Sequence, residues 1–116
     1  MCADRFAYLH TVPAIALEKA LEKAKLSVDD LGLIEINEAF ASVALHAARM
    51  LGANEDVVNV NGGSVALGHA LGSTGARMAV TLVHELVRRG LRYGAATLCG
   101  GGGQGYALIV ERPSGR

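Results

Sequence analysis

The sequence predicts one α/β domain with a mixed, mostly parallel sheet and helices on both of its faces. Segments with helical 3–4 spacing alternate with short apolar runs in the order α–β–α–β–α–β–β. Such alternation is typical of right-handed crossovers between parallel strands. The last two apolar runs are joined only by a short glycine-rich link, which is too short for a crossover helix. The final strand is therefore expected to pair antiparallel with the strand before it.

Three helices are expected from their apolar stripes. The first lies within residues 11–26, and the second covers residues 38–52. The third covers about residues 73–89 and is stopped by Gly90, a residue type common just after a helix end. The apolar face expected for the second helix consists of Phe40, Val43, Ala44, Ala47 and Leu51.

Four short apolar or β-branched runs are expected to form the strands. They are residues 31–37, 56–61, 94–99 and 105–111. A short capped turn is expected at Ser27–Asp30, just before the first of these strands. Residues 1–12 supply no convincing strand, although an open α/β sheet usually begins with one. Residues 1–116 are therefore interpreted as a single domain that lacks its leading strand, as if truncated at its N-terminal edge.

Composition excludes several classes of function. The 116 residues suffice for one domain. The 11 basic and 11 acidic residues cancel, and aromatic residues make up only 4%, so neither nucleic acid nor an anionic membrane is an expected partner. No apolar run approaches transmembrane length, and the first residues lack the apolar core of a signal peptide. With only two cysteines, the expectation is a cytoplasmic protein with reduced thiols and no metal site.

The 15 glycines gather mainly in two clusters, at residues 62–75 and 100–105. The second cluster, GGGGQG, matches G-x-G-x-x-G in letters. A strand-like segment follows it, however, whereas a dinucleotide site needs a helix there. The first cluster lacks the Gly-Lys-Ser/Thr of a phosphate loop. Taken alone, the second cluster is best interpreted as a hairpin turn.

Three polar side chains follow the ends of the expected strands. Asn37 ends the first strand, His69 lies in the loop after the second, and Cys99 ends the third. Because ligands of open α/β sheets bind at the carboxyl ends of the strands, an amide, an imidazole and a thiol are expected at one edge. This combination suits acyl transfer or carbanion chemistry. Each has a simpler interpretation: a helix N-cap for Asn37, a loop histidine for His69 and a small buried apolar residue for Cys99.

Three segments together resemble the C-terminal signature blocks of the thiolases, the acyl-CoA C-acyltransferases. They are NEAFA at residues 37–41, NGG…ALGHALGSTGAR at residues 61–77, and CGGGGQGYA at residues 99–107. The resemblance covers nearly all of residues 11–112, in the right order and spacing. It implies the fold of a thiolase C-terminal domain. It also implies thiolysis of 3-ketoacyl-CoA or Claisen condensation of acetyl-CoA, with the coenzyme A thioester as substrate and no separate cofactor.

The resemblance also assigns roles to individual residues. His69 would activate the nucleophile and face a thioester oxygen, and Asn37 would hold a water that completes this oxyanion site. Cys99 would be the acid/base, and the N–H of Gly101 would help form a second oxyanion site. The residues placed against the substrate are Phe40 and Gly68.

These roles give the glycines and the thiol a physical purpose. Backbone N–H donors stabilise a developing oxyanion, and a residue without Cβ lets a substrate approach them. A cysteine pKa near ~8.5 needs only a modest shift for proton transfer near neutrality. A ketoacyl synthase is the related alternative, but such enzymes commonly use a second histidine where this chain has Cys99. Two positions depart from the family pattern: Ala70 stands where proline is common, and Gly100 where a larger apolar residue is common.

The family's nucleophile has no counterpart in this chain. The other thiol, Cys2, lies at the N-terminus without a nucleophile-like motif. The chain is thus interpreted as the C-terminal part of a thiolase of lipid metabolism, inactive alone and completed in cis or in trans by an N-terminal half. The complete enzyme is expected to be a dimer or tetramer. The alternative is a non-catalytic thiolase-like module that binds coenzyme A or a protein.

Overall fold

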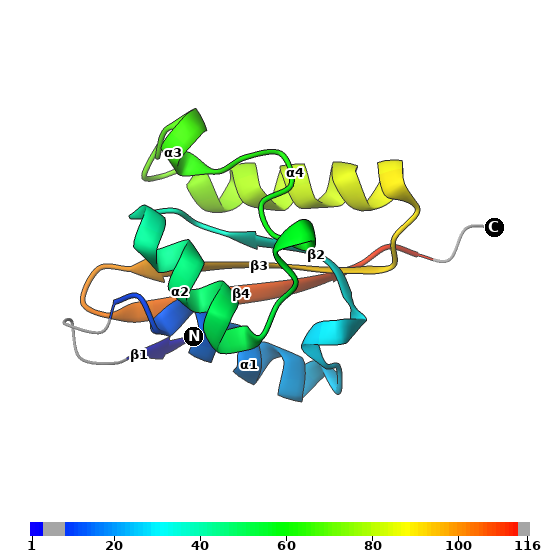
Figure 1. The fold of residues 1–116 in the computed structure, drawn as a ribbon, viewed down its shortest axis with the longest axis horizontal. Helices are drawn as coiled ribbons and strands as arrows, with labels where there is room; N and C mark the ends of the chain where they lie inside the picture. Colours follow the sequence, from blue (N-terminus) through cyan, green and yellow to red (C-terminus); the bar gives the residue numbers. More distant parts are fainter. Residues whose placement is uncertain (4–8, 114–116) are drawn as a thin grey trace.

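The computed structural model describes residues 1–3 and 9–113, which form one four-stranded sheet in the order β1-β4-β3-β2. Figure 1 shows the sheet nearly edge-on, between α4 above and α1 below. The strands are β1 (Cys2–Ala3), β2 (Leu31–Ile36), β3 (Tyr93–Gly100) and β4 (Gln104–Glu111). The helices are α1 (Val12–Ala24), α2 (Ala41–Leu51), α3 (Ser64–Leu67) and α4 (Thr74–Arg89), with 3-10 turns at Val28–Asp30 and Glu55–Val57.

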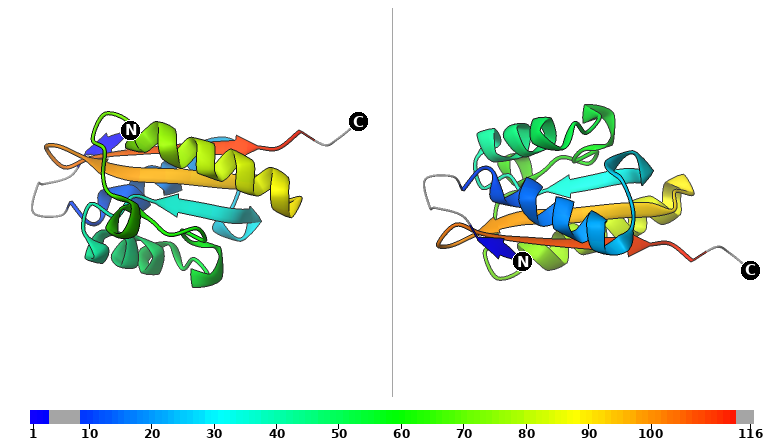
Figure 2. Two further views of the ribbon diagram at one scale, coloured as in Figure 1. Left: turned by 90° about the horizontal axis from the view of Figure 1, so that it is seen from above. Right: turned by 90° about the horizontal axis from the view of Figure 1, so that it is seen from below.

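Helices cover both faces of the sheet, as expected, and each face has its own apolar core (Figure 2). On one face, α1 and α2 pack against β2 and β3 through residues such as Leu17, Ile34 and Ala47. On the other, α4 packs through Met78 and Leu82, among others. Pro13 stands in the first turn of α1, where its missing N–H leaves no helical hydrogen bond unmade. None of the helices in the described residues is long and apolar enough to span a membrane.

The expected turn before β2 is present. The carboxylate of Asp30 accepts hydrogen bonds from the backbone N–H and the hydroxyl of Ser27, at 2.7 and 2.8 Å. These bonds lower the pKa of Asp30, since they favour its charged form.

The sheet is mixed and its last strand is antiparallel, as expected, but it is less parallel than the sequence predicts. Among the strands of the described residues, only β2 and β3 pair in parallel, while β4 pairs antiparallel with both β3 and β1. The difference arises because residues 56–61 do not form a strand. Only Val58 makes a bridge to β2, and the chain then turns at Asn59, whose φ is +47°. The Asn59 side chain bonds both the N–H and the C=O of Ile36, at 2.8 and 2.9 Å, and so replaces the backbone of a strand.

The expectation that no leading strand exists is wrong for residues 2 and 3. Cys2 pairs with Gly105 and Ala3 with Gln104, so that β1 extends the sheet beyond β4. Two residues are too few to show the alternation by which a strand is predicted. The rest of the expected strandless segment includes residues 4–8, which lie outside the described residues.

The second helix begins at Ala41, three residues later than expected. Phe40 is its extended N-cap residue and is 65% exposed, so it does not belong to the buried face of α2. The side chain of Glu38, which was expected to open the helix, instead accepts hydrogen bonds from Val65 N–H at 2.8 Å and Asn59 Nδ2 at 3.3 Å. These tertiary contacts outweigh the helical preference of residues 38–40.

Gly105 lies where β4 packs against the start of α1, between β1 and β3. A Cβ at this position would lie 2.4 Å from the carbonyl oxygen of Val12. Gly105→Ala is therefore expected to lower the free energy of unfolding by about 1–3 kcal/mol, the usual cost of overpacking. Urea denaturation measures the change. Gly75→Ala is the matched control, because a Cβ there, within α4, meets nothing within 4 Å. It is expected to raise stability by ~0.5–1 kcal/mol. Equal stabilities of the two variants would contradict the packing argument.

Candidate active site

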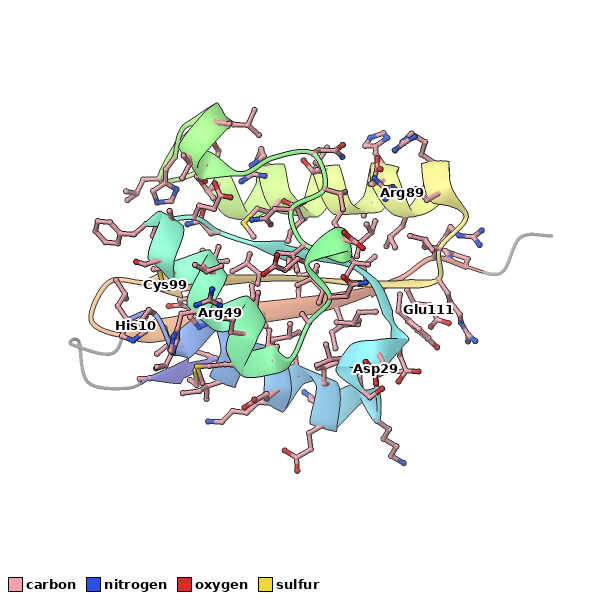
Figure 3. All side chains as sticks on the ribbon, viewed as in Figure 1. His10, Asp29, Arg49, Arg89, Cys99 and Glu111 are labelled. Atoms are coloured by element: carbon pink, nitrogen blue, oxygen red, sulfur yellow. The ribbon has the colours of Figure 1, made fainter. Side chains whose placement is uncertain are left out.

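The parallel pairing of β2 and β3 brings the ends of both strands to one edge of the sheet. Ile36 pairs with Thr97, and the N–H of Asn37 donates to the carbonyl oxygen of Thr97 at 3.0 Å. The loop that contains α3 returns to the same edge, beside the β3–β4 hairpin (Figure 1). Cys99 lies at this end of β3 (Figure 3). The edge predicted from the order of the strands is thus assembled.

Three of the predicted site residues line one open cavity of about 370 Å³ at this edge: His69, Cys99 and Gly101. The remaining wall includes the apolar side chains Leu9, Ala39, Leu71 and Leu98. An imidazole, a thiol and backbone of the glycine turn therefore face one apolar-walled space. Such a space suits proton transfer beside a desolvated acyl group.

His69 lies in the loop between α3 and α4, with an exposed side chain. Its Nδ1 is 2.7 Å from the hydroxyl of Thr74, the first residue of α4. That hydroxyl also lies 3.0 Å from the carbonyl oxygen of Ala70 and is oriented as its donor. A proline at residue 70 would supply the same carbonyl, so this departure from the family pattern removes no partner of Thr74.

Asn37 is buried, with 1% of its surface exposed. Its Oδ1 accepts a hydrogen bond from the hydroxyl of Ser64 at 2.7 Å, while its Nδ2 has no partner among the described residues. Buried amide donors almost always have an acceptor, so this group favours a water or ligand oxygen beside it. The N-cap interpretation of Asn37 is wrong, because Phe40 is the N-cap residue of α2. Ser64 was not singled out from the sequence, where it is one small residue in a glycine-rich loop.

Burial raises the pKa of the Cys99 thiol, and a hydrogen bond from its own backbone N–H lowers it by less. The expected role requires a modest shift of this pKa toward neutrality, whereas in this chain burial shifts it away from neutrality. Burial disfavours the thiolate because a charged sulfur loses more hydration than a neutral one. The resting group is the protonated thiol, which is the form that donates a proton.

The glycine run is a hairpin turn, in agreement with its simplest interpretation. Gly102 and Gly103 have φ of +76° and +74°, which side chains rarely tolerate. A Cβ on Gly100 would lie 2.9 Å from the ring of Tyr106, which explains why a larger residue is absent there. Gly101 differs, because a Cβ there would meet nothing within 4 Å. The space in front of Gly101 is therefore open to a ligand.

The two remaining predicted residues lie apart from the cavity wall. Phe40 is exposed at the start of α2, and Gly68 ends α3 with φ of +86°. No group of three or more His, Cys, Asp or Glu side chains in the described part of the chain could hold a metal ion.

A partly buried ion pair that sequence reasoning missed ties β2 to α4 near the site. Nη1 of Arg77 lies 3.2 Å from Oε2 of Glu35, which is almost fully buried two residues before Asn37. Burial raises the pKa of Glu35, against the lowering effect of Arg77. Side chains alternate between the two faces of the sheet along β2, which places Glu35 on the face that α4 covers. Only the fold shows that Arg77 reaches Glu35 there.

Comparison with known proteins identifies the family. Residues 2–112 match the family model of the thiolase C-terminal domain. An acetyl-CoA acetyltransferase of Chromobacterium violaceum is 58% identical over 101 residues, which cover 87% of this chain and 26% of that protein. A 3-ketoacyl-CoA thiolase of Bacillus subtilis is 50% identical over 99 residues, 85% of this chain and 25% of that protein.

Solved structures agree with the sequence relatives. The crystal structure of human mitochondrial 3-ketoacyl-CoA thiolase superposes with a TM-score of 0.94 at 43% identity, covering 97% of this chain and 29% of that one. The same holds for its complex with CoA. The chain thus spans about a quarter of the length of the curated relatives it matches. From its motifs, its fold and these matches, the chain belongs to the thiolase family, and residues 2–112 correspond to the C-terminal domain of that family.

Proposed function

We propose that this chain supplies the histidine and the acid/base cysteine of an acyl-CoA C-acyltransferase. The reaction is thiolysis of 3-ketoacyl-CoA or Claisen condensation of acetyl-CoA. The observation that carries the proposal is the shared cavity of His69, Cys99 and Gly101. The names of the relatives support the reaction class, and the complex of a related thiolase with CoA supports the substrate class.

In the acylation step, His69 takes a proton from the thiol of a cysteine nucleophile. The thiolate adds to the thioester carbonyl, and coenzyme A leaves as a thiolate. This thiolate then takes the proton of the Cys99 thiol, which leaves Cys99 as a thiolate. The protonated imidazole then donates a hydrogen bond to the thioester oxygen. The unpartnered Nδ2 of Asn37 is suited to hold a water that donates to the same oxygen. Preorganised donors of this kind lower the barrier, because they need no reorganisation as charge develops.

In the condensation step, the Cys99 thiolate left by acylation removes the α-proton of acetyl-CoA, and the N–H of Gly101 stabilises the enolate oxygen. The enolate carbon then attacks the acyl-enzyme carbonyl, and the nucleophile leaves as a thiolate, which recovers its proton from His69. Thiolysis is the reverse, with Cys99 returning the proton to the α-carbon. The raised pKa of Cys99 keeps the thiol protonated at rest, ready for this return. Phe40 and Gly68 are proposed to contact the coenzyme A arm.

The nucleophile must come from outside the cavity described here. The chain has two cysteines, and Cys2 does not line the cavity. It is buried in a small apolar cluster against which Cys99 packs, with its thiol 3.4 Å from the carbonyl oxygen of Val12. An N-terminal thiolase half, in cis or in trans, is the proposed source. The outer face of α4 supports this partner, because it exposes an apolar stripe of Val80, Val83 and Val87. The complete enzyme is proposed to be a cytoplasmic dimer or tetramer of lipid metabolism.

The thiol of Cys99 is expected to react slowly with iodoacetamide in this chain near neutral pH. A raised pKa leaves less thiolate, the reactive form, than in a free cysteine. The rate should keep rising with pH beyond ~8.5, where a free cysteine levels off. Peptide mapping by mass spectrometry follows Cys99 and Cys2 separately, with a cysteine peptide as the reference. A rate above that of the peptide at neutral pH would contradict the effect of burial.

The 116-residue chain alone is expected not to cleave acetoacetyl-CoA with coenzyme A, since no acyl-enzyme forms without a nucleophile. Joining or mixing it with the N-terminal part of a related thiolase is expected to restore cleavage. Loss of the thioester enolate absorbance follows the reaction. Persistent inactivity of a well-folded joined protein, with retained coenzyme A binding, would favour a non-catalytic module.

In that complete enzyme, two variants are expected to separate the proposed roles. Cys99→Ser should still acquire an acetyl group from acetyl-CoA but lose condensation and α-proton exchange by ~10²–10⁴-fold, the usual range for a lost general acid–base. His69→Ala should instead impair acylation. Intact-protein mass spectrometry detects acylation, and deuterium uptake measures exchange. Cys2→Ala is the control and should affect neither. Loss of acylation with intact exchange in Cys99→Ser would refute the assignment.

A further inference from the structure

Thr74 links His69 to the backbone at the start of α4. It is nearly fully buried, and its hydroxyl is the only group within hydrogen-bonding distance of His69 Nδ1 among the described residues. The same hydroxyl lies 3.0 Å from the carbonyl oxygen of Ala70. A hydroxyl has one proton, so it can donate to only one of these two neighbours at a time.

The number of hydrogen bonds decides which way the proton points. If the hydroxyl donates to Ala70, its lone pair accepts the Nδ1–H of His69, and both bonds form. If the hydroxyl instead donates to Nδ1, no proton points to the carbonyl oxygen of Ala70, and only the bond to Nδ1 remains. A carbonyl oxygen cannot reverse roles, because it only accepts. The Ala70 oxygen also accepts the N–H groups of Ser73 and Thr74, at 2.8 and 2.9 Å, which holds it in place.

We infer that Thr74 is a positioning residue that holds neutral His69 in the tautomer with its proton on Nδ1. The second ring nitrogen, Nε2, is then left with a free lone pair. This inference deepens the proposed function and rests on it for its consequence, because a base that activates a thiol needs that lone pair. In the opposite tautomer, Nε2 carries the proton and cannot accept another.

The geometry also explains how the loop delivers the imidazole. His69 is exposed, so packing does little to orient its ring. The contact with Thr74 anchors the ring on one nitrogen to the first turn of a 16-residue helix. That helix is fixed to β2 through Arg77 and Glu35. The ring orientation is therefore set by the body of the domain rather than by the loop alone.

The tautomer can be measured directly in this chain by long-range ¹H–¹⁵N NMR, which distinguishes a protonated from an unprotonated ring nitrogen. The spectrum is recorded at a pH where the imidazole is neutral, and His69→Asn identifies the His69 signals by their loss. The unmodified chain is expected to show a protonated Nδ1 and an unprotonated Nε2. Thr74→Val keeps the side-chain shape but lacks the hydroxyl, so it should shift His69 toward the Nε2-protonated tautomer. Thr74→Ser should restore the original spectrum.

Ser73→Ala is the matched control. The Ser73 hydroxyl is 3.4 Å from the same Ala70 oxygen, yet it has no contact with His69 in the structure. Its loss should leave the tautomer unchanged. A protonated Nε2 in the unmodified chain, or a tautomer unaltered by a folded Thr74→Val, would overturn the inference. The NMR measurement involves no acyl transfer, so it tests the tautomer separately from the reaction. The inferred tautomer can be wrong while the proposed reaction is right, and the reaction can be wrong while the tautomer is right.

Discussion

The parallel pairing of β2 with β3 is the constraint on which the site depends, and buried Thr97 lies at its end. The carbonyl oxygen of Thr97 accepts the N–H of Asn37, which continues the pairing one residue beyond β2. Its hydroxyl lies within hydrogen-bonding distance of the carbonyl oxygens of Pro13 and Tyr106. The backbone and side chain of this one residue thus join β3 to the end of β2, to α1 and to β4. Since Cys99 is two residues further along β3, its position follows directly from this junction.

Short polar contacts then connect this end of the sheet to the loop that contains α3 and His69. Ser64 binds Asn37, Thr74 binds His69, and Glu38 accepts the N–H of Val65. Each contact joins a loop or helix start to a group near the end of β2 or beside the cavity. A glycine-rich segment gains little from apolar packing, so hydrogen bonds supply the order that its side chains cannot. The geometry of the proposed site is thereby held by groups to which no chemical step is assigned.

The glycines of the hairpin that follows Cys99 meet two structural demands, a left-handed backbone conformation and space for neighbouring groups. Gly102 and Gly103 satisfy the left-handed turn, while Gly100 and Gly105 leave space for Tyr106 and for the start of α1. Among these glycines only Gly101 is free of both demands, and it lines the cavity beside Gly100. Most of the run is therefore explained by folding, and one position by access to the backbone. This division reconciles the hairpin interpretation with an oxyanion site.

Much of the outline was determined by the sequence itself. Apolar periodicity predicted α1, α4 and the three long strands to within a few residues, because burial imposes that period locally. The positions of Asn37, His69 and Cys99 after the expected strands predicted that they belong to one edge. The three motifs predicted the family that the matches then established. Local patterns sufficed here because each depends on neighbours only a few residues apart.

Other features were decided only by tertiary structure. Residues 56–61 resemble a strand, yet the side chain of Asn59 occupies the edge of β2 in its place. The two residues of β1 form a strand because they pair with the free edge of β4. Phe40 lies outside the body of α2 because the Glu38 side chain is hydrogen-bonded to Val65 and Asn59. The contacts of Ser64 with Asn37 and of Arg77 with Glu35 join residues 27 and 42 positions apart. No local pattern encodes such partners, since their free energy depends on which distant groups the fold brings together.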